Sequence, residues 1–252
     1  MDTEKHGLDD AMRAIAEAAP RRFYATRPSP CPYLPGRLER TVFTELTGPE
    51  ADGLHDLLAV NGFRRNQGIA YRPFCESCTA CVAVRVRVAE FRSKKWMRRV
   101  NSRNADLEMI TRPPKATVEQ YQLFARYLEA RHFDGGMADM SFEEYRTMIE
   151  ETSVSTEVIE FRDQSGELVA ACLVDTLGDG LSLIYSFFTP SQPKASYGSA
   201  VILKLIERAK AEQREHVYLG YWSAESQTRA YNARFEPIEA LGPNGWQVLS
   251  RG

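Results

Sequence analysis

The chain has 252 residues, of which 43% are hydrophobic and 26% are charged, values typical of a globular protein with one large domain or two small ones. The formal net charge of -2 hides a strong local asymmetry, so the overall balance neither indicates nor excludes an anionic partner. The sequence has no apolar run long enough to span a bilayer and no apolar signal segment near its start, so we expect a cytoplasmic protein without membrane contact. Five cysteines in such a chain favour reduced thiols or a metal site over a disulfide framework.

The first part of the chain mixes strand and helix patterns. In chain order it predicts a tail or short helix, a proline-rich loop, a strand, a helix that ends at Asn61-Gly62, and a strand pair (1–20, 21–40, 41–46, 51–63, 64–74). Residues 82–88 then place Arg85 and Arg87 between valines, a period-two pattern that indicates a strand with one buried and one basic face.

Pro113-Pro114 interrupt the chain before a long amphipathic helix, and we expect a domain boundary there, with domains 1–110 and 111–252. A helix capped by Ser141 and Glu144 follows. The remaining pattern predicts three strands, a helix that opens at Gly198, a strand, a short helix and a last strand (155–163, 167–178, 180–190, 198–213, 216–222, 223–235, 244–249). This order resembles the acyltransferase fold of the GNAT type, so the expected class is α+β, with a GNAT-like C-terminal domain and a smaller N-terminal α+β domain.

Four of the five cysteines form a spaced set. Cys75, Cys78 and Cys81 make two overlapping Cys-x-x-Cys units, and Cys31 is a distant fourth thiol. Such spacing suits tetrahedral thiolate coordination of zinc or an iron–sulfur cluster, although a second separated knuckle is missing. Free or buried thiols explain the pattern equally well. Cys172 lies in a predicted strand and is expected in the core.

A basic tract begins within the strand at 82–88 and continues to Arg103. It holds eight cations and one acid, Glu90, and is interleaved with Phe91 and Trp96. The cations are Arg85, Arg87, Arg92, Lys94, Lys95, Arg98, Arg99 and Arg103. Concentrated positive charge with aromatic stacking surfaces favours a nucleic-acid contact over a solvated charged face.

No known catalytic motif accounts for chemistry in this chain. The sequence has no phosphate-binding glycine loop and no ordered Ser/His/Asp set. His132, followed by Gly135 and Gly136, fits a helix end better than a catalytic group. Covalent and ATP-driven chemistry are therefore not supported.

Several segments together resemble the bacterial aspartate/glutamate leucyltransferases, which are similar to the eukaryotic arginyl-tRNA–protein transferases. The segments are spread along the chain (31–46, 62–88, 98–107, 130–137, 183–190, 218–222), and the resemblance covers nearly all of it. The resemblance implies transfer of leucine from leucyl-tRNA to proteins that begin with Asp or Glu, which marks them for degradation by the N-degron pathway. It implies a cysteine-bearing N-terminal domain and a GNAT-like domain that holds the aminoacyl end of tRNA, with no required cofactor.

The sequence departs from the family pattern at positions near the expected cleft. These are Thr228, Arg229 and Asn232, the run at 94–97, and the run at 194–197. The choice of substrate therefore stays open. An arginyl-tRNA–protein transferase is one alternative, with Asp175 and Glu225 as acids near the cleft. A tRNA-binding thiol or metal sensor without transfer activity is another, and an acetyltransferase is a third.

An aminoacyl ester is already activated, so the enzyme has chiefly to position the acceptor amine and assist its loss of a proton. We expect backbone groups of the strand at 181–188 to align the ester, with Tyr185 and Ser186, the catalytic candidates, at the splayed centre of the fold. A cation must recognise the acceptor's carboxylate, and the candidates are Arg64, Arg65 and Arg72. Gly198, Tyr221 and Trp222 are candidates for the donor site. The expected tRNA contacts are Lys94, Lys95, Arg98, Arg99 and Arg103.

Overall fold

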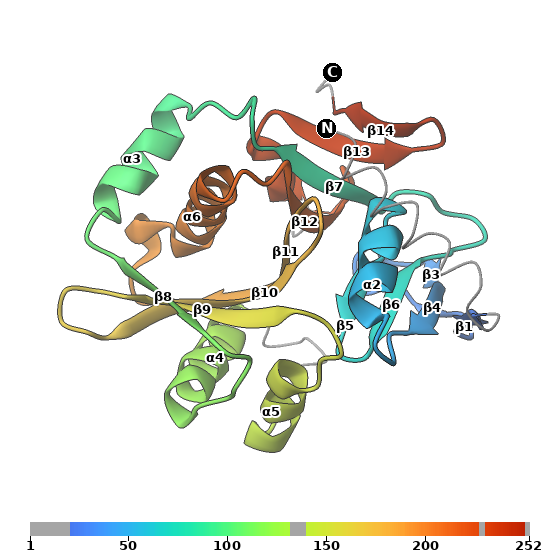
Figure 1. Ribbon diagram of the computed structural model, residues 1–252, viewed down its shortest axis with the longest axis horizontal. Helices are drawn as coiled ribbons and strands as arrows, with labels where there is room; N and C mark the ends of the chain where they lie inside the picture. Colours follow the sequence, from blue (N-terminus) through green and yellow to red (C-terminus); the bar gives the residue numbers. More distant parts are fainter. Residues whose placement is uncertain (1–20, 132–139, 227–229, 250–252) are drawn as a thin grey trace.

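The computed structural model describes residues 21–131, 140–226 and 230–249 (Figure 1). An eight-stranded sheet with helices on both faces forms the larger part, and a four-stranded sheet with one helix lies at its end. The expected α+β class is confirmed. Within the described ranges no helix combines the length and apolar character needed to cross a membrane.

The smaller part is built from the N-terminal third of the chain. Its sheet has the order β1-β4-β6-β5, and a separate pair, β2 and β3, lies beside it. The elements are β1 Tyr24–Ala25, β2 Ser29–Pro30, β3 Leu38–Glu39, β4 Thr41–Glu45, α2 Ala51–Val60, β5 Arg64–Asn66 and β6 Ile69–Pro73. Leu54 and Leu58 of α2 pack on Leu46 and Ala70. The helix ends at Asn61-Gly62 as expected, since Gly62 has a φ of 81°, which only glycine adopts without strain.

The large sheet has the order β14-β13-β7-β12-β11-β10-β9-β8. Its strands are β7 Val82–Arg87, β8 Glu108–Arg112, β9 Thr156–Arg162, β10 Leu168–Thr176, β11 Gly180–Phe188, β12 His216–Trp222, β13 Ile238–Gly242 and β14 Gly245–Val248. Neighbours are antiparallel except β11 and β12, which are parallel. Strand β10 is buried on both faces, which explains its nearly continuous apolar sequence.

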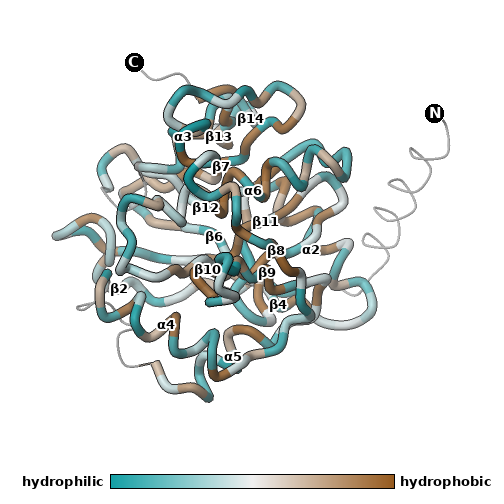
Figure 2. Tube along the Cα trace, turned by 90° about the vertical axis from the view of Figure 1, so that its left-hand side faces the viewer, coloured by the Kyte–Doolittle hydropathy of each residue, from teal (hydrophilic) through white to brown (hydrophobic). Residues whose placement is uncertain are grey.

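Helices cover both faces of this sheet. Helices α3 (Lys95–Arg103) and α6 (Tyr197–Ala211) lie on one face, and α4 (Val118–Arg131) and α5 (Phe142–Glu150) lie on the other (Figure 1). A short 3-10 helix, η1 Pro193–Ala195, precedes α6. A second one, η2 Ala230–Arg234, follows β12. Hydrophilic and hydrophobic residues alternate along α4, as expected of a helix with one buried face (Figure 2).

Most predicted elements are confirmed in the described residues, including the capping box, in which the Glu144 amide donates to Ser141 Oγ over 3.3 Å. The sequence analysis missed β8 and β13, and its predicted loop at 21–40 contains the short strands β1, β2 and β3. Of its short helix at 223–235 the structure describes only η2 as helical. The expected tail at 1–20 lies outside the described residues. The expected domain boundary at 110 falls inside the large sheet, because β7 and β8 both belong to it. The sheets themselves divide near residue 81.

Candidate active site

Strands β11 and β12 separate part-way along their length. They pair only between Gly180–Ser182 and His216–Tyr218, and beyond these residues β12 continues beside β7 instead. Among the described residues, no strand pairs on that side with the second half of β11, which includes Tyr185 and Ser186. Helix α6 connects the two parallel strands. This is the arrangement expected for a GNAT-type fold, and that expectation is confirmed.

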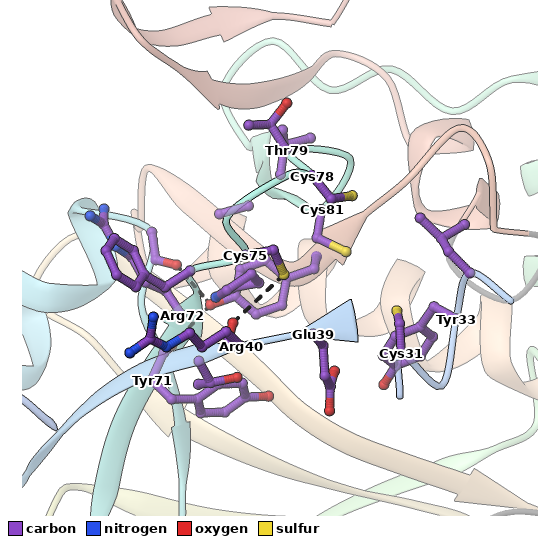
Figure 3. Close-up of a pocket in the computed structure, with 18 of the residues that line it drawn as sticks. Cys31, Tyr33, Glu39, Arg40, Tyr71, Arg72, Cys75, Cys78, Thr79 and Cys81 are labelled. Carbon is purple, nitrogen blue, oxygen red and sulfur yellow. Dashed lines mark hydrogen bonds between the residues drawn. The ribbon is translucent and has the colours of Figure 1, made fainter. Parts of the chain in front are cut away.

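One cavity, of about 800 Å³, lies between the smaller sheet and β12 (Figure 3). We call it the cysteine cavity because Cys31, Cys75, Cys78 and Cys81 all line it. Its walls also include Tyr33, Arg37, Arg40, Tyr71, Arg72 and Tyr221. The structure therefore brings the four spaced cysteines to one place, together with Arg72.

The cysteines of this cavity do not form a metal site as they stand. Cys75, Cys78 and Cys81 come from one loop, whereas Cys31 follows β2 on another wall (Figure 3). Among the described residues no three His, Cys, Asp or Glu side chains are close enough together to hold a metal ion. The donor set has the right chemistry for zinc, but its geometry does not fit tetrahedral coordination.

Cys78 is a polarised thiol of the cavity. The Ala80 amide and the Arg37 guanidinium both hydrogen-bond its sulfur, with Arg37 Nη1 at 3.2 Å, and these bonds lower the pKa of Cys78. Arg37 also forms an ion pair of 2.6 Å with Glu225, which follows β12. The cysteine loop is thereby tied to the loop after β12.

A second cavity, of about 500 Å³, lies at the first turn of α6, and we call it the α6 cavity. Ser186, Phe188, Gly198 and Ser199 line it, together with Tyr127, Arg131, Tyr231 and Arg234. A side chain at 198 would come within 2.9 Å of the Phe188 ring, so glycine allows this close packing. None of the described residues that line the α6 cavity is an Asp or Glu.

The charge of the α6 cavity is positive. Arg131 lies over the Phe188 ring at 5.3 Å and Arg234 over the Trp96 ring at 4.4 Å, contacts that position both cations. The start of α6 adds the positive end of a helix dipole. Two guanidinium groups beside a helix N-terminus suit an anionic group such as a phosphate.

Tyr185 lines neither cavity but interacts electrostatically with one tyrosine of each. Burial raises its pKa, and so do Tyr127, which lines the α6 cavity, and Tyr33, which lines the cysteine cavity. Its ring packs at 5.9 Å from Phe124 of α4. At neutral pH the hydroxyl is therefore protonated and able to donate a hydrogen bond.

The three arginines predicted to bind the acceptor lie in different surroundings. Arg65 is fully buried, and its Nε and Nη2 donate to Asp175 over 2.7 Å each, so it is unavailable to a ligand. Arg64 donates to backbone carbonyls of β11. Arg72 is exposed, lines the cysteine cavity and lies over the Phe63 ring at 5.1 Å. Of the three, Arg72 alone faces a described cavity.

Comparisons with known proteins agree with this architecture. Residues 29–99 match the family profile described as "Arginine-tRNA-protein transferase, N terminus", and residues 119–242 match "Arginine-tRNA-protein transferase, C terminus". Proteins named aspartate/glutamate leucyltransferase from Granulibacter bethesdensis, Parvibaculum lavamentivorans and Afipia carboxidovorans are 49%, 51% and 52% identical to this chain. These matches cover 92%, 90% and 89% of this chain and 87%, 94% and 92% of the relatives.

The chain belongs to the arginine-tRNA-protein transferase family. Similar solved structures include L-PGS from Bacillus licheniformis, with a TM-score of 0.47 and 16% identity over 62% of this chain and 52% of that one. FemX has a TM-score of 0.43 and 9% identity, over 85% of this chain and 67% of its own. Likeness at this level carries no argument about the activity of the transferase.

The donor-site candidates in this family member divide between the cavities. Gly198 lines the α6 cavity, whereas Tyr221 lines the cysteine cavity. The Tyr221 hydroxyl donates to Gly62 O or Tyr71 O, at 3.0 and 2.9 Å. Trp222 is half-buried against the main core and is not among the residues of either cavity.

The basic tract is only partly exposed in the transferase. The expected basic face of β7 is covered, because Arg85 pairs with Glu239 at 2.8 Å and lies 4.3 Å from the Trp246 ring. Arg87 also forms ion pairs, with Glu90 and Glu239. Phe91 and Trp96 pack against the core, which corrects the expectation that they offer free stacking surfaces.

The expected tRNA contacts, by contrast, are exposed. Lys95, Arg98, Arg99 and Arg103 lie on α3 and Lys94 precedes it. Lys94 pairs with Glu236 over 2.5 Å, and Arg103 donates to Lys194 O of η1 over 3.0 Å. Because η1 borders the α6 cavity through Pro193, the C-terminal end of the basic helix contacts an element of that cavity.

Some sequence-predicted positions lie outside the described residues, namely His132, Gly135, Gly136, Thr228 and Arg229. Asn232 is buried, and its Nδ2 donates to Leu219 O of β12 over 3.0 Å. The sequence analysis missed two pairs of cavity residues, Tyr127 with Arg131 and Tyr231 with Arg234. An aromatic residue three or four positions before an arginine is the signal they share.

Proposed function

We propose that this chain is a cytoplasmic leucyltransferase, which moves leucine from leucyl-tRNA onto proteins that begin with Asp or Glu, a step of an N-degron pathway. The observation that carries the proposal is that Tyr185 interacts with Tyr127 of the α6 cavity and with Tyr33 of the cysteine cavity. A transferase needs two substrates side by side, and each cavity has the charge and shape for one of them. Relatives about 50% identical over most of the chain are named for this activity.

The α6 cavity suits the donor end of the tRNA. Arg131, Arg234 and the first turn of α6 would bind phosphate near the 3′ end, with the terminal ribose toward Ser186. An arginyl donor would need an acid for its guanidinium. Both acids that suggested an arginine donor are already paired, since Asp175 binds Arg65 and Glu225 binds Arg37. Leucine is therefore the better donor.

The exposed cations of α3 would extend this site along the tRNA. Lys95, Arg98 and Arg99 have no carboxylate partner among the ion pairs of the described residues. Phosphate oxygens of the acceptor stem could take that place without base recognition. The covered faces of Phe91 and Trp96 support contact with the backbone rather than with stacked bases.

The cysteine cavity suits the acceptor. Arg72 offers a planar fork for the side-chain carboxylate of an N-terminal Asp or Glu. The acceptor amine would then reach toward Tyr185 from the side of Tyr33. Zinc or a cluster on the cysteines stays a prediction, and metal analysis of the purified protein tests it.

The chemistry then needs little from the side chains. The amine attacks the ester carbonyl carbon of the leucyl group, a C–N bond forms and the C–O bond to the ribose breaks. The proton lost by the amine ends on the ribose oxygen. Because an α-amino group has a pKa of roughly 7.7–8.0, no strong base is required. Tyr185, kept protonated by its raised pKa, would donate a hydrogen bond to the carbonyl oxygen as charge develops there.

The test is transfer of labelled leucine or arginine from charged tRNA to peptides that begin with Asp, Glu or Ala. We expect leucine on the Asp and Glu peptides only. Transfer of arginine instead would make this an arginyltransferase. Binding of tRNA without any transfer would favour the sensor alternative.

A further inference from the structure

The gap between β11 and β12 is occupied by one side chain from the smaller sheet. Arg64 of β5 reaches into it, and its Nη2 donates to Leu183 O over 2.6 Å and to Ile184 O over 3.0 Å. These carbonyls come directly after Ser182, the last residue of β11 that pairs with β12. The guanidinium therefore replaces the missing strand as their hydrogen-bond partner.

The opposite side of the gap is shaped for this guanidinium. Gly220 of β12 has a φ of 87°, and a Cβ built on it would lie 2.6 Å from Arg64 Cζ and closer still to Nη1. Any other residue at 220 would displace Arg64 or adopt a strained backbone. The carbonyl of the preceding residue, Leu219, accepts from Asn232 Nδ2. Side chains thus bind backbone carbonyls on both separated strands.

The position of Arg64 is fixed by its neighbour in β5. Arg65 forms the buried double hydrogen bond to Asp175 of β10, the strand beside β11. Adjacent residues of a strand point to opposite sides, so Arg65 anchors β5 while Arg64 enters the gap. The smaller sheet is therefore connected directly to the backbone of Leu183 and Ile184, the two residues that precede Tyr185.

We propose that Arg64 is a positioning residue of the transfer reaction, which holds β11 and β12 apart and fixes the backbone before Tyr185. The inference rests on the proposed function for its kinetic consequences. It replaces the expectation that Arg64 reads the acceptor's carboxylate. Without the guanidinium, two carbonyls lose their partner and the strands are free to move together or to admit water. Either change misplaces Tyr185 and Ser186 relative to both substrates.

The kinetic test compares Arg64→Ala with the exposed control Arg146→Ala, whose side chain on α5 pairs with Glu143 alone in the described residues. We expect Arg64→Ala to lower kcat by about 10- to 100-fold, the usual cost of a small misplacement of reacting groups. The KM values for leucyl-tRNA and for the Asp peptide should both stay within about threefold of wild type. Methylguanidinium should restore part of the kcat of Arg64→Ala. An increase in the KM for the Asp peptide with unchanged kcat would overturn the inference.

A double-mutant cycle with Gly220→Ala separates the gap from general strain. The strained φ at residue 220 affects Gly220→Ala both in the wild type and in Arg64→Ala. The clash between the new Cβ and the guanidinium exists only when Arg64 is present. We expect Gly220→Ala to lower kcat at least tenfold more in the wild type than in Arg64→Ala. Additive effects of the two changes would overturn the inference.

Hydrogen exchange gives a readout that needs no activity. In Arg64→Ala the amides of residues 183–186 and 219–222 should change their exchange rates at least tenfold, with the rest of the large sheet unchanged. Unchanged rates there would overturn the inference even if transfer were lost. A wild-type protein that transfers no amino acid but shows the expected exchange pattern would refute the proposed function alone.

Discussion

Replacing Arg65 by methionine removes one half of a fully buried ion pair. Removal of one partner from such a pair typically costs about 3–5 kcal/mol, because the other charge stays buried without compensation. Asp175 keeps its hydrogen bond of 2.8 Å from Thr156 Oγ1, so we expect a loss near the lower limit, about 3 kcal/mol. In a chain of this size that lowers Tm by roughly 6–12 °C.

The double variant Arg65→Met/Asp175→Leu provides the matched control. It leaves no uncompensated charge, so at least half of the lost stability should return. Thermal melting followed by circular dichroism measures both variants, and transfer to Asp and Ala peptides is measured well below either Tm. The reasoning would be refuted if Arg65→Met kept its Tm while the KM for the Asp peptide rose tenfold. Arg65 would then be the acceptor-binding residue that the sequence suggested.

Three further predictions concern the cavities and the basic helix. Arg72→Ala should raise the KM for Asp and Glu peptides about 10- to 100-fold and leave the KM for leucyl-tRNA unchanged, whereas equal changes in both would remove Arg72 from the acceptor site. Alanine at residues 95, 98 and 99 together should reduce the slope of log KM for tRNA against log salt concentration by about 2–3, and an unchanged slope would place the tRNA elsewhere. The Ala80 amide and Arg37 together hold the pKa of Cys78 below its usual value, so alkylation of Cys78 should begin at a lower pH in wild type than in Arg37→Ala. Peptide mass spectrometry follows the alkylation, and coincident pH profiles of the two proteins would contradict this prediction.

The features that sequence could predict are those set by neighbours along the chain. The period-two valines of β7 gave its buried face, and Ser141 with Glu144 gave the start of α5, because both depend on residues a few positions apart. The spaced cysteines likewise predicted a shared location, and all four line one cavity. The arrangement of the four sulfur atoms depends on where the segment around Cys31 lies in the fold. The spacing of the cysteines along the chain does not determine that position.

The roles of the arginines could not be read from sequence, because their partners are distant in the chain. Arg65 and Asp175 are 110 residues apart in the sequence. Arg64 and Ile184, whose carbonyl it binds, are 120 residues apart. Both arginines appear in the sequence as equivalent cations beside Arg72. Arg85 is similar, since the ring that covers it belongs to Trp246 near the end of the chain. Tertiary packing, rather than local pattern, separates the structural arginines from the one available to a ligand.

In the proposed reaction the donor and the acceptor occupy different cavities, each with a tyrosine that interacts with Tyr185. Hydrogen exchange in the presence of each substrate part tests it most directly, with 3′-leucylamido-3′-deoxyadenosine as a stable donor analogue and a short peptide beginning with Asp as the acceptor. We predict that the donor analogue protects the first turn of α6 and the end of β11, and that the peptide protects the cysteine loop at 75–81 and β6. Protection of the same segments by both molecules, or protection of the cysteine loop by the donor analogue, would contradict the account.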